Sequence, residues 1–101
     1  MILYNVTIKV HSSIHNEWLV WLKEEHIKEI MQTECFSSFK ILKLLEIDET
    51  EGPTYAVQYF AESKALYNIY IEKFSAEIRN HSFTKWGDKF IAFRSVMQIV
   101  D

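Results

Sequence analysis

The sequence has few of the residues that mark disordered, disulfide-rich or loop-dominated proteins. Its 101 residues include two glycines, one proline and one cysteine. So little glycine and proline disfavours disorder, and a lone Cys35 cannot form an internal disulfide, which favours a reducing, cytoplasmic location. The length predicts one domain over residues 1–101, without room for a second core.

The chain also lacks the usual features of nucleic-acid and membrane proteins. Its net charge is −3 and no Lys/Arg-rich stripe stands out, so we expect no nucleic-acid partner. No apolar run approaches the roughly 20 residues that span a bilayer, so we expect no membrane partner. The alternating N-terminal segment is typical of a strand rather than a signal peptide.

Motifs that would specify a reaction are missing as well. There is no P-loop, no dinucleotide-binding glycine pattern, no HExxH and no CxxC. We therefore predict neither a cofactor nor a metal site. The sequence does contain many large rings, with three Trp, five Tyr and seven Phe. A core this small has difficulty hiding fifteen of them, which indicates an interface.

The apolar periodicity predicts four strands and two helices. Alternation predicts a strand over 2–10, and a helical stripe from 14 to 31 follows a cap at Ser12 or Ser13. Strands over 36–47 and 54–61 flank an acidic turn at 48–53. A second helix follows a cap at Ser63, residues 80–88 are undecided with Gly87 as a terminator, and the last strand covers 89–100. This β-α-β-β-α-β order predicts a ferredoxin-like α+β fold with one four-stranded antiparallel sheet.

Two helices can cover only one face of such a sheet, although three of the four strands are apolar on both faces. The alternation places two sets under the helices, one of Ile2, Tyr4, Val6, Ile8 and Val10 and one of Tyr55, Val57 and Tyr59. It places Leu3, Asn5, Thr7, Ala56, Gln58 and Phe60 on the open face. Arg94 is assigned to the open face, because an unpaired arginine under helices is costly. An apolar patch of this kind predicts a sheet-to-sheet homodimer.

Several segments resemble one bacterial family of about this length, known only as a domain of unknown function. They are residues 2–8 (ILYNVTI), residues 15–21 (HNEWLVW), His26, residues 54–60 (TYAVQYF) and residues 89–94 (KFIAFR). The resemblance covers nearly the whole chain and implies a dimeric α+β barrel. That architecture is shared by antibiotic-biosynthesis-type monooxygenases, muconolactone-isomerase-like proteins and stress-responsive barrel proteins, but it brings no activity with it.

His26 is the candidate catalytic residue, because it lies on the buried stripe where a neutral imidazole can act as a base or bind a ligand. The alternative is a core histidine bonded to a backbone or tyrosine oxygen. Asn5, Gln58 and Arg94 are the other candidate ligand-binding residues, since adjacent strands bring them to one polar spot suited to a carboxylate or carbonyl. The alternative is a polar cluster that fixes the dimer register.

Two functions of different kinds follow. The first is a small homodimeric protein that binds a small hydrophobic ligand. The second is a cofactor-free monooxygenase- or isomerase-like enzyme acting on an aromatic or lactone-like metabolite, with His26 as base and Arg94, Asn5 and Gln58 positioning an oxyanion. A protein–protein adaptor with Trp21 or Trp86 as an exposed anchor is a third possibility.

Overall fold

The predicted order of strands and helices is confirmed by the computed structural model, which describes residues 1–101. The first helical region is one continuous rod of three segments, and the second is divided in two. The elements are β1 (Ile2–Val10), α1 (His15–Trp21), the π-helical segment η1 (Leu22–His26), α2 (Ile27–Met31), β2 (Ser38–Lys43), β3 (Thr54–Ala61), α3 (Lys64–Lys73), α4 (Ser75–Trp86) and β4 (Phe90–Gln98).

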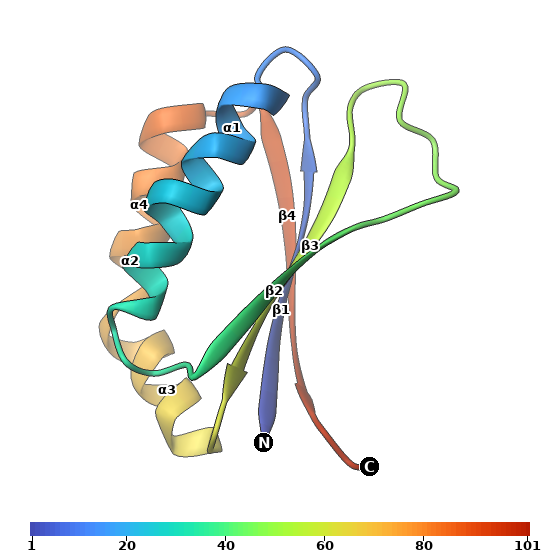
Figure 1. Ribbon diagram of the computed structural model, residues 1–101. Helices are drawn as coiled ribbons and strands as arrows, with labels where there is room; N and C mark the ends of the chain where they lie inside the picture. The colour runs from blue at the N-terminus through green and yellow to red at the C-terminus, as the bar shows by residue number, and fades with distance from the viewer.

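The four strands form one antiparallel sheet in the order β2-β3-β1-β4. All helices lie on the same side of this sheet, and nothing covers its other side (Figure 1). The molecule measures 38 × 31 × 19 Å. Its shortest dimension matches one layer of helices on one sheet, since each such layer is about 10 Å thick. The protomer is therefore a two-layer slab.

The covered face of the sheet holds the core. The strand alternation of β1 buries Tyr4, Val6, Ile8 and Val10, and that of β3 buries Tyr55, Val57 and Tyr59. Both sets were predicted to face the helices, and both predictions are confirmed. The helices add a stripe of large side chains, which comprises Trp18, Trp21, Leu22, Ile27, Ile30, Tyr70 and Ile78.

Two of the three predicted helix-end residues are confirmed. Ser63 caps α3 by accepting a hydrogen bond from the Leu66 backbone N–H at 3.2 Å, and Gly87 ends α4 with φ = +59°. Positive φ is readily adopted by glycine, which is why the helix stops there. The predicted cap at Ser12 or Ser13 is wrong: α1 begins at His15 with no side-chain cap.

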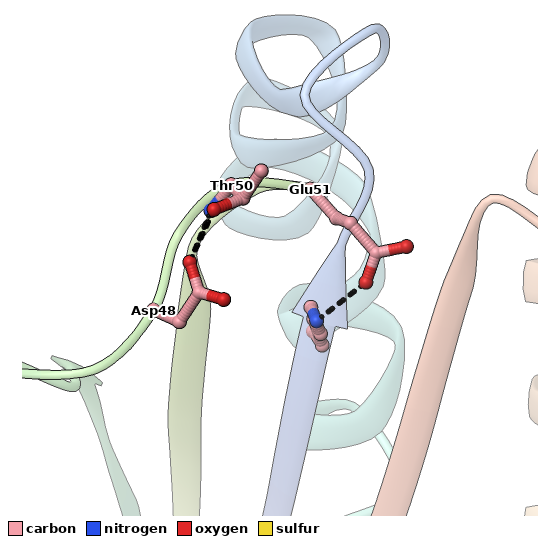
Figure 2. A network of polar contacts seen from close by, with 4 residues as sticks. Asp48, Thr50 and Glu51 are labelled. Atoms are coloured by element: carbon pink, nitrogen blue, oxygen red, sulfur yellow. Dashed lines mark hydrogen bonds and ion pairs between the residues drawn. The ribbon is translucent and has the colours of Figure 1, made fainter.

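The loop between β2 and β3 is fixed to the end of β1. Asp48 accepts hydrogen bonds from Thr50 (Figure 2). Glu51 pairs with Lys9 at the end of β1, with 2.9 Å between the Glu51 Oε1 and Lys9 Nζ atoms. Gly52 has φ = +146°, and a Cβ on it would lie 1.9 Å from the Val10 carbonyl oxygen. Only glycine fits this close approach. The loop starts early, so the strand predicted over 36–47 is reduced to Ser38–Lys43.

Candidate functional site

Arg94 lies on the helix-covered face, so its predicted place on the open face is wrong. In the antiparallel register Arg94 is the direct partner of Val6, and Ala92 is the partner of Ile8. Direct partners share a face, which places Arg94 with the core side chains. The cost that argued against this position is reduced because β4 is an edge strand, where the Arg94 side chain stays exposed.

Asn5 and Gln58 are brought together on the open face, as predicted, but without Arg94. They are register partners, and the Gln58 Nε2 atom donates to Asn5 Oδ1 at 3.4 Å. Asn5 Nδ2 also donates to Thr7 Oγ1 at 3.0 Å. Lys40 and Ser95 extend this polar row across the whole sheet. The sequence-predicted polar spot is therefore divided between the two faces.

Apolar side chains lie on both sides of that polar row. One flanking row contains Leu42, Ala56, Thr7 and Phe93, and the other contains Phe60, Leu3 and Met97. Several are strongly exposed in the protomer, with exposed fractions of 67% for Phe93, 57% for the adjacent Ile91, 43% for Met97 and 42% for Leu42. The open face is thus an apolar surface with the neutral Asn5–Gln58 pair at its centre and the charged Lys40 at the β2 edge of the same row.

His26 is the last residue of the π-helical segment. The Ile27 N–H donates to the Leu22 carbonyl, five residues back, and single π turns of this kind occur often at functional sites. The imidazole stacks on Trp21 with ring centroids 4.6 Å apart, and its buried Nδ1 atom has no hydrogen-bond partner. Burial, joined by the positive charges of Arg94 and His81, lowers the pKa of His26 to about 4. The ring is therefore neutral at pH 7.

Two small cavities adjoin His26 between the helices and the sheet. Each has a volume of about 30 Å³, which is room for one or two water molecules. Both are lined by Val6, Ile8, His26, Ser82 and Arg94. The first also contacts Tyr4, Ile30, Tyr59, Tyr70, Ile78 and Arg79, and the second contacts Trp18, Trp21, Phe90 and Ala92. We call them the arginine–tyrosine compartment and the tryptophan compartment.

Arg79 was missed by the sequence reasoning, although it is one of only two arginines in the chain. It projects from α4, and its Nη2 atom donates to the Tyr4 hydroxyl at 3.3 Å. Its Nε atom is buried and has no partner. The signal that was available is its position one residue after the buried Ile78 of the helix, which brings it to the edge of the core stripe.

A shallow groove on the outer surface of the helices reaches His26 from the other side. It has a volume of about 490 Å³ and runs between η1, α2 and α4. Within it the His81 Nδ1 atom lies 2.8 Å from Glu29 Oε2. No group of three His, Cys, Asp or Glu side chains in the fold is arranged to hold a metal ion. His26 therefore separates a charged outer groove from the two inner cavities.

Three other side chains that could bind or react, His15, Cys35 and Trp21, lie in structural positions. The His15 Nε2 and Tyr55 hydroxyl atoms lie 2.6 Å apart, Cys35 is buried, and the Trp21 indole is buried against His26 and Trp86. A buried Trp21 is no exposed anchor, so the adaptor interpretation keeps only the half-buried Trp86.

A family model described as "Domain of unknown function (DUF4286)" matches residues 1–100. The chain belongs to this family. No curated protein sequence matches it. The resemblance in the strand and helix segments is thereby confirmed, and the family's description states no activity.

Solved structures of low sequence identity share the fold. SnoaB, a cofactor-independent oxygenase from Streptomyces nogalater, has a TM-score of 0.70 at 9% identity, covering 99% of this chain and 93% of SnoaB. MhuD, solved with two manganese protoporphyrin IX molecules per active site, has a TM-score of 0.66 at 16% identity, covering 99% and 95%. A dimeric ferredoxin-like protein from an uncultured marine organism has a TM-score of 0.59 at 14% identity, covering 99% and 96%.

These similarities confirm the ferredoxin-like α+β fold and, at such low identity, nothing about the reaction. None of the helices combines the length and the apolar character that a membrane span requires.

Proposed function

We propose that this protein is a homodimer, paired through the open faces of its two sheets, and that each protomer binds a small molecule between its helices and its sheet. The observation that carries the dimer is the exposed apolar surface around Phe93, Met97 and Leu42. Apolar patches of this kind are unusual on soluble monomers and mark interaction sites.

A second copy of the chain is the occupant that this surface fits best. The broad side of the slab measures 38 by 31 Å, which exceeds the area of about 800 Å² per partner in a standard interface. A twofold axis through the centre of the face would bring the neutral Asn5–Gln58 pair onto its own copy, with apolar rows on both sides. A dimeric ferredoxin-like protein among the similar structures supports a homodimer.

Small-angle X-ray scattering distinguishes this dimer from other assemblies. Pairing face to face doubles the 19 Å thickness and gives a nearly isometric particle, whereas pairing edge to edge along β4 extends the longer dimensions of 38 and 31 Å. We expect a compact particle of twice the protomer mass. A radius of gyration close to the 13.7 Å of one protomer, or an elongated particle, would contradict the proposal.

Ligand binding is supported by the surroundings of His26. Its unpartnered Nδ1 atom lies beside cavities lined by aromatic and polar side chains, a combination typical of ligand sites. Each cavity has room for only one or two water molecules in this state, so we propose that a ligand enters by displacing Arg94, which lines both cavities and is exposed at the β4 edge. Only a small molecule fits.

Benzyl alcohol is a suitable neutral probe for this site. At millimolar concentration it should shift the ring signals of Trp21 and His26 in the NMR spectrum, because both rings contact the cavities. The His15 ring, bonded to Tyr55 and outside both cavities, is the internal reference. Equal shifts at all three rings would indicate non-specific binding, and no shift would refute binding of small aromatic molecules.

A second candidate function is proton transfer at His26, as in a cofactor-free oxygenase or isomerase. The observation that favours it is the neutral imidazole with a free Nδ1 atom beside Arg94. Nδ1 would take a proton from a bound aromatic or lactone-like substrate, and Arg94 would stabilise the oxyanion. His26→Gln should then abolish deuterium exchange into such a substrate even at concentrations that saturate the variant. Unchanged exchange would exclude the base role.

A further inference from the structure

We infer that the arginine–tyrosine compartment is a carboxylate site, so that the ligand is a small apolar molecule carrying one carboxylate. This inference rests on the proposed ligand-binding function and adds the chemical class. The anionic group would lie between Arg79 and Arg94, and the apolar body would extend past His26 into the tryptophan compartment.

The distribution of charge is the first argument. The chain has 14 acidic residues and only two arginines, yet both arginines line the same cavity and no Asp or Glu does. Neither arginine forms an ion pair within the protomer. Glu29 is the acidic residue near enough to raise the pKa of the cavity residue Tyr70 by its charge. Its carboxylate is already paired with His81, with 2.8 Å between Glu29 Oε2 and His81 Nδ1. Two guanidinium groups without a counter-charge favour an external anion.

The hydrogen-bonding groups are the second argument. The buried Arg79 Nε–H has no acceptor, and Arg79 is oriented by its bond to the Tyr4 hydroxyl. A guanidinium fork held in one orientation matches the two oxygens of a carboxylate. The other polar group at the junction, His26, is neutral and accepts no hydrogen bond from the protein. Its Nδ1 atom is free to form a hydrogen bond with a second polar atom of the ligand.

The walls of the tryptophan compartment define the rest of the ligand. Trp18, Trp21, Phe90 and Ala92 present aromatic and aliphatic surface, with no charged group apart from the shared Arg94. The charge-bearing and apolar compartments meet at His26 and Arg94. An aromatic or short aliphatic carboxylate has the same division into a charged end and an apolar end.

Benzoate and its neutral isostere benzamide test the inference on the intact protein. Because the chain has only two arginines, its ¹⁵N NMR spectrum has two arginine Nε–H signals to follow. Benzoate should shift both signals and bind at least tenfold more tightly than benzamide, since hydrogen bonds to charged groups are the stronger ones. Arg79→Gln should weaken the binding of benzoate at least tenfold and that of benzamide much less, because a neutral carbonyl gains less from a guanidinium.

Lys73→Gln is the matched control, because it removes a positive charge from an exposed helix position outside the cavity. It should leave both affinities unchanged. Equal affinities of the wild type for benzoate and benzamide would overturn the carboxylate site but leave the proposed ligand-binding function standing. Binding of neither probe would overturn both. Binding of benzamide to Arg79→Gln would show that this variant is folded. If Arg79→Gln does not bind benzamide, the affinities for benzoate and benzamide are compared in Arg94→Gln instead.

Discussion

The two faces of the sheet are both rich in apolar side chains, but they use their polar groups differently. On the covered face, Tyr4 and Ile8 pack under the helices, and the polar groups Arg79, Arg94 and His26 surround small cavities with unpartnered atoms. On the open face, Asn5 and Gln58 bond to each other, and the apolar side chains around them are exposed. The covered face has polar atoms without hydrogen-bond partners, and the open face has apolar side chains exposed to solvent.

This difference separates two kinds of recognition in one small domain. Unpartnered charged groups in a narrow space favour a small polar ligand, because each gains a strong hydrogen bond on binding. Exposed apolar surface around a satisfied polar pair favours a large, complementary partner surface. This contrast is why we propose ligand binding at the covered face and dimerisation through the open face.

The largest effect is expected from cutting the packing of the covered face. Ile8→Ala should lower the free energy of unfolding by about 2–5 kcal/mol, because it leaves a cavity in the core. Val20→Ala, on the exposed side of α1, should change it by less than about 0.5 kcal/mol. Urea denaturation measures both. Equal losses for the two variants would show that Ile8 does not belong to the core.

A charge on the open face should break the dimer without unfolding the protomer. Phe93→Glu buries an unpaired carboxylate in the proposed interface and should weaken dimerisation at least about 100-fold. Val20→Glu, at another strongly exposed apolar position but on the helical side, should have no effect on dimerisation. Sedimentation velocity measures both variants. If both dissociate, or neither, the open face is not the interface.

Acid should destabilise the covered face through His26. Its pKa is lowered to about 4 in the folded protein, so between pH 6.5 and 4 the unfolded chain binds the additional proton and stability falls as the pH falls. Between pH 7.5 and 5 the expected loss is about 2 kcal/mol. His26→Gln should remove this part of the loss. Urea denaturation of the wild type and of His26→Gln at the two pH values measures the loss of unfolding free energy. Equal losses in the two proteins would contradict this role of His26.

The smallest effect is expected at the polar centre of the open face. Asn5→Ala removes one neutral hydrogen bond and should weaken the dimer about twofold to tenfold. It should leave the ligand affinity of the covered face unchanged. An effect as large as that of Phe93→Glu would mean that the Asn5–Gln58 pair, rather than the apolar rows, carries the interface.

Sequence periodicity was sufficient for the fold because most of its strands and helices bury one clear stripe. The alternation of β1 and β3 predicted which residues face the helices. It failed for β4, where Ile91 and Phe93 alternate with Ala92 and Arg94. Either of these two sets could face the helices on the alternation alone. Register with β1 decides the face of an edge strand, and a single sequence does not give that register.

The candidate site was predicted in part for the same reason. His26 and the Asn5–Gln58 pair follow from helix and strand periodicity, which is local information. Arg79 and the π turn before His26 depend on how α4 and η1 pack across the sheet. Such packing is tertiary, and helix spacing places Arg79 only at the edge of the core stripe, without showing that it meets Tyr4 or Arg94.

Sedimentation velocity of the wild-type protein at micromolar concentration tests the central claim most directly, because an interface of standard size should remain associated there. We predict a species of twice the 12.1 kDa protomer mass. A single species of 12.1 kDa over the whole concentration range would show that the exposed face of the sheet stays in water and would contradict the account.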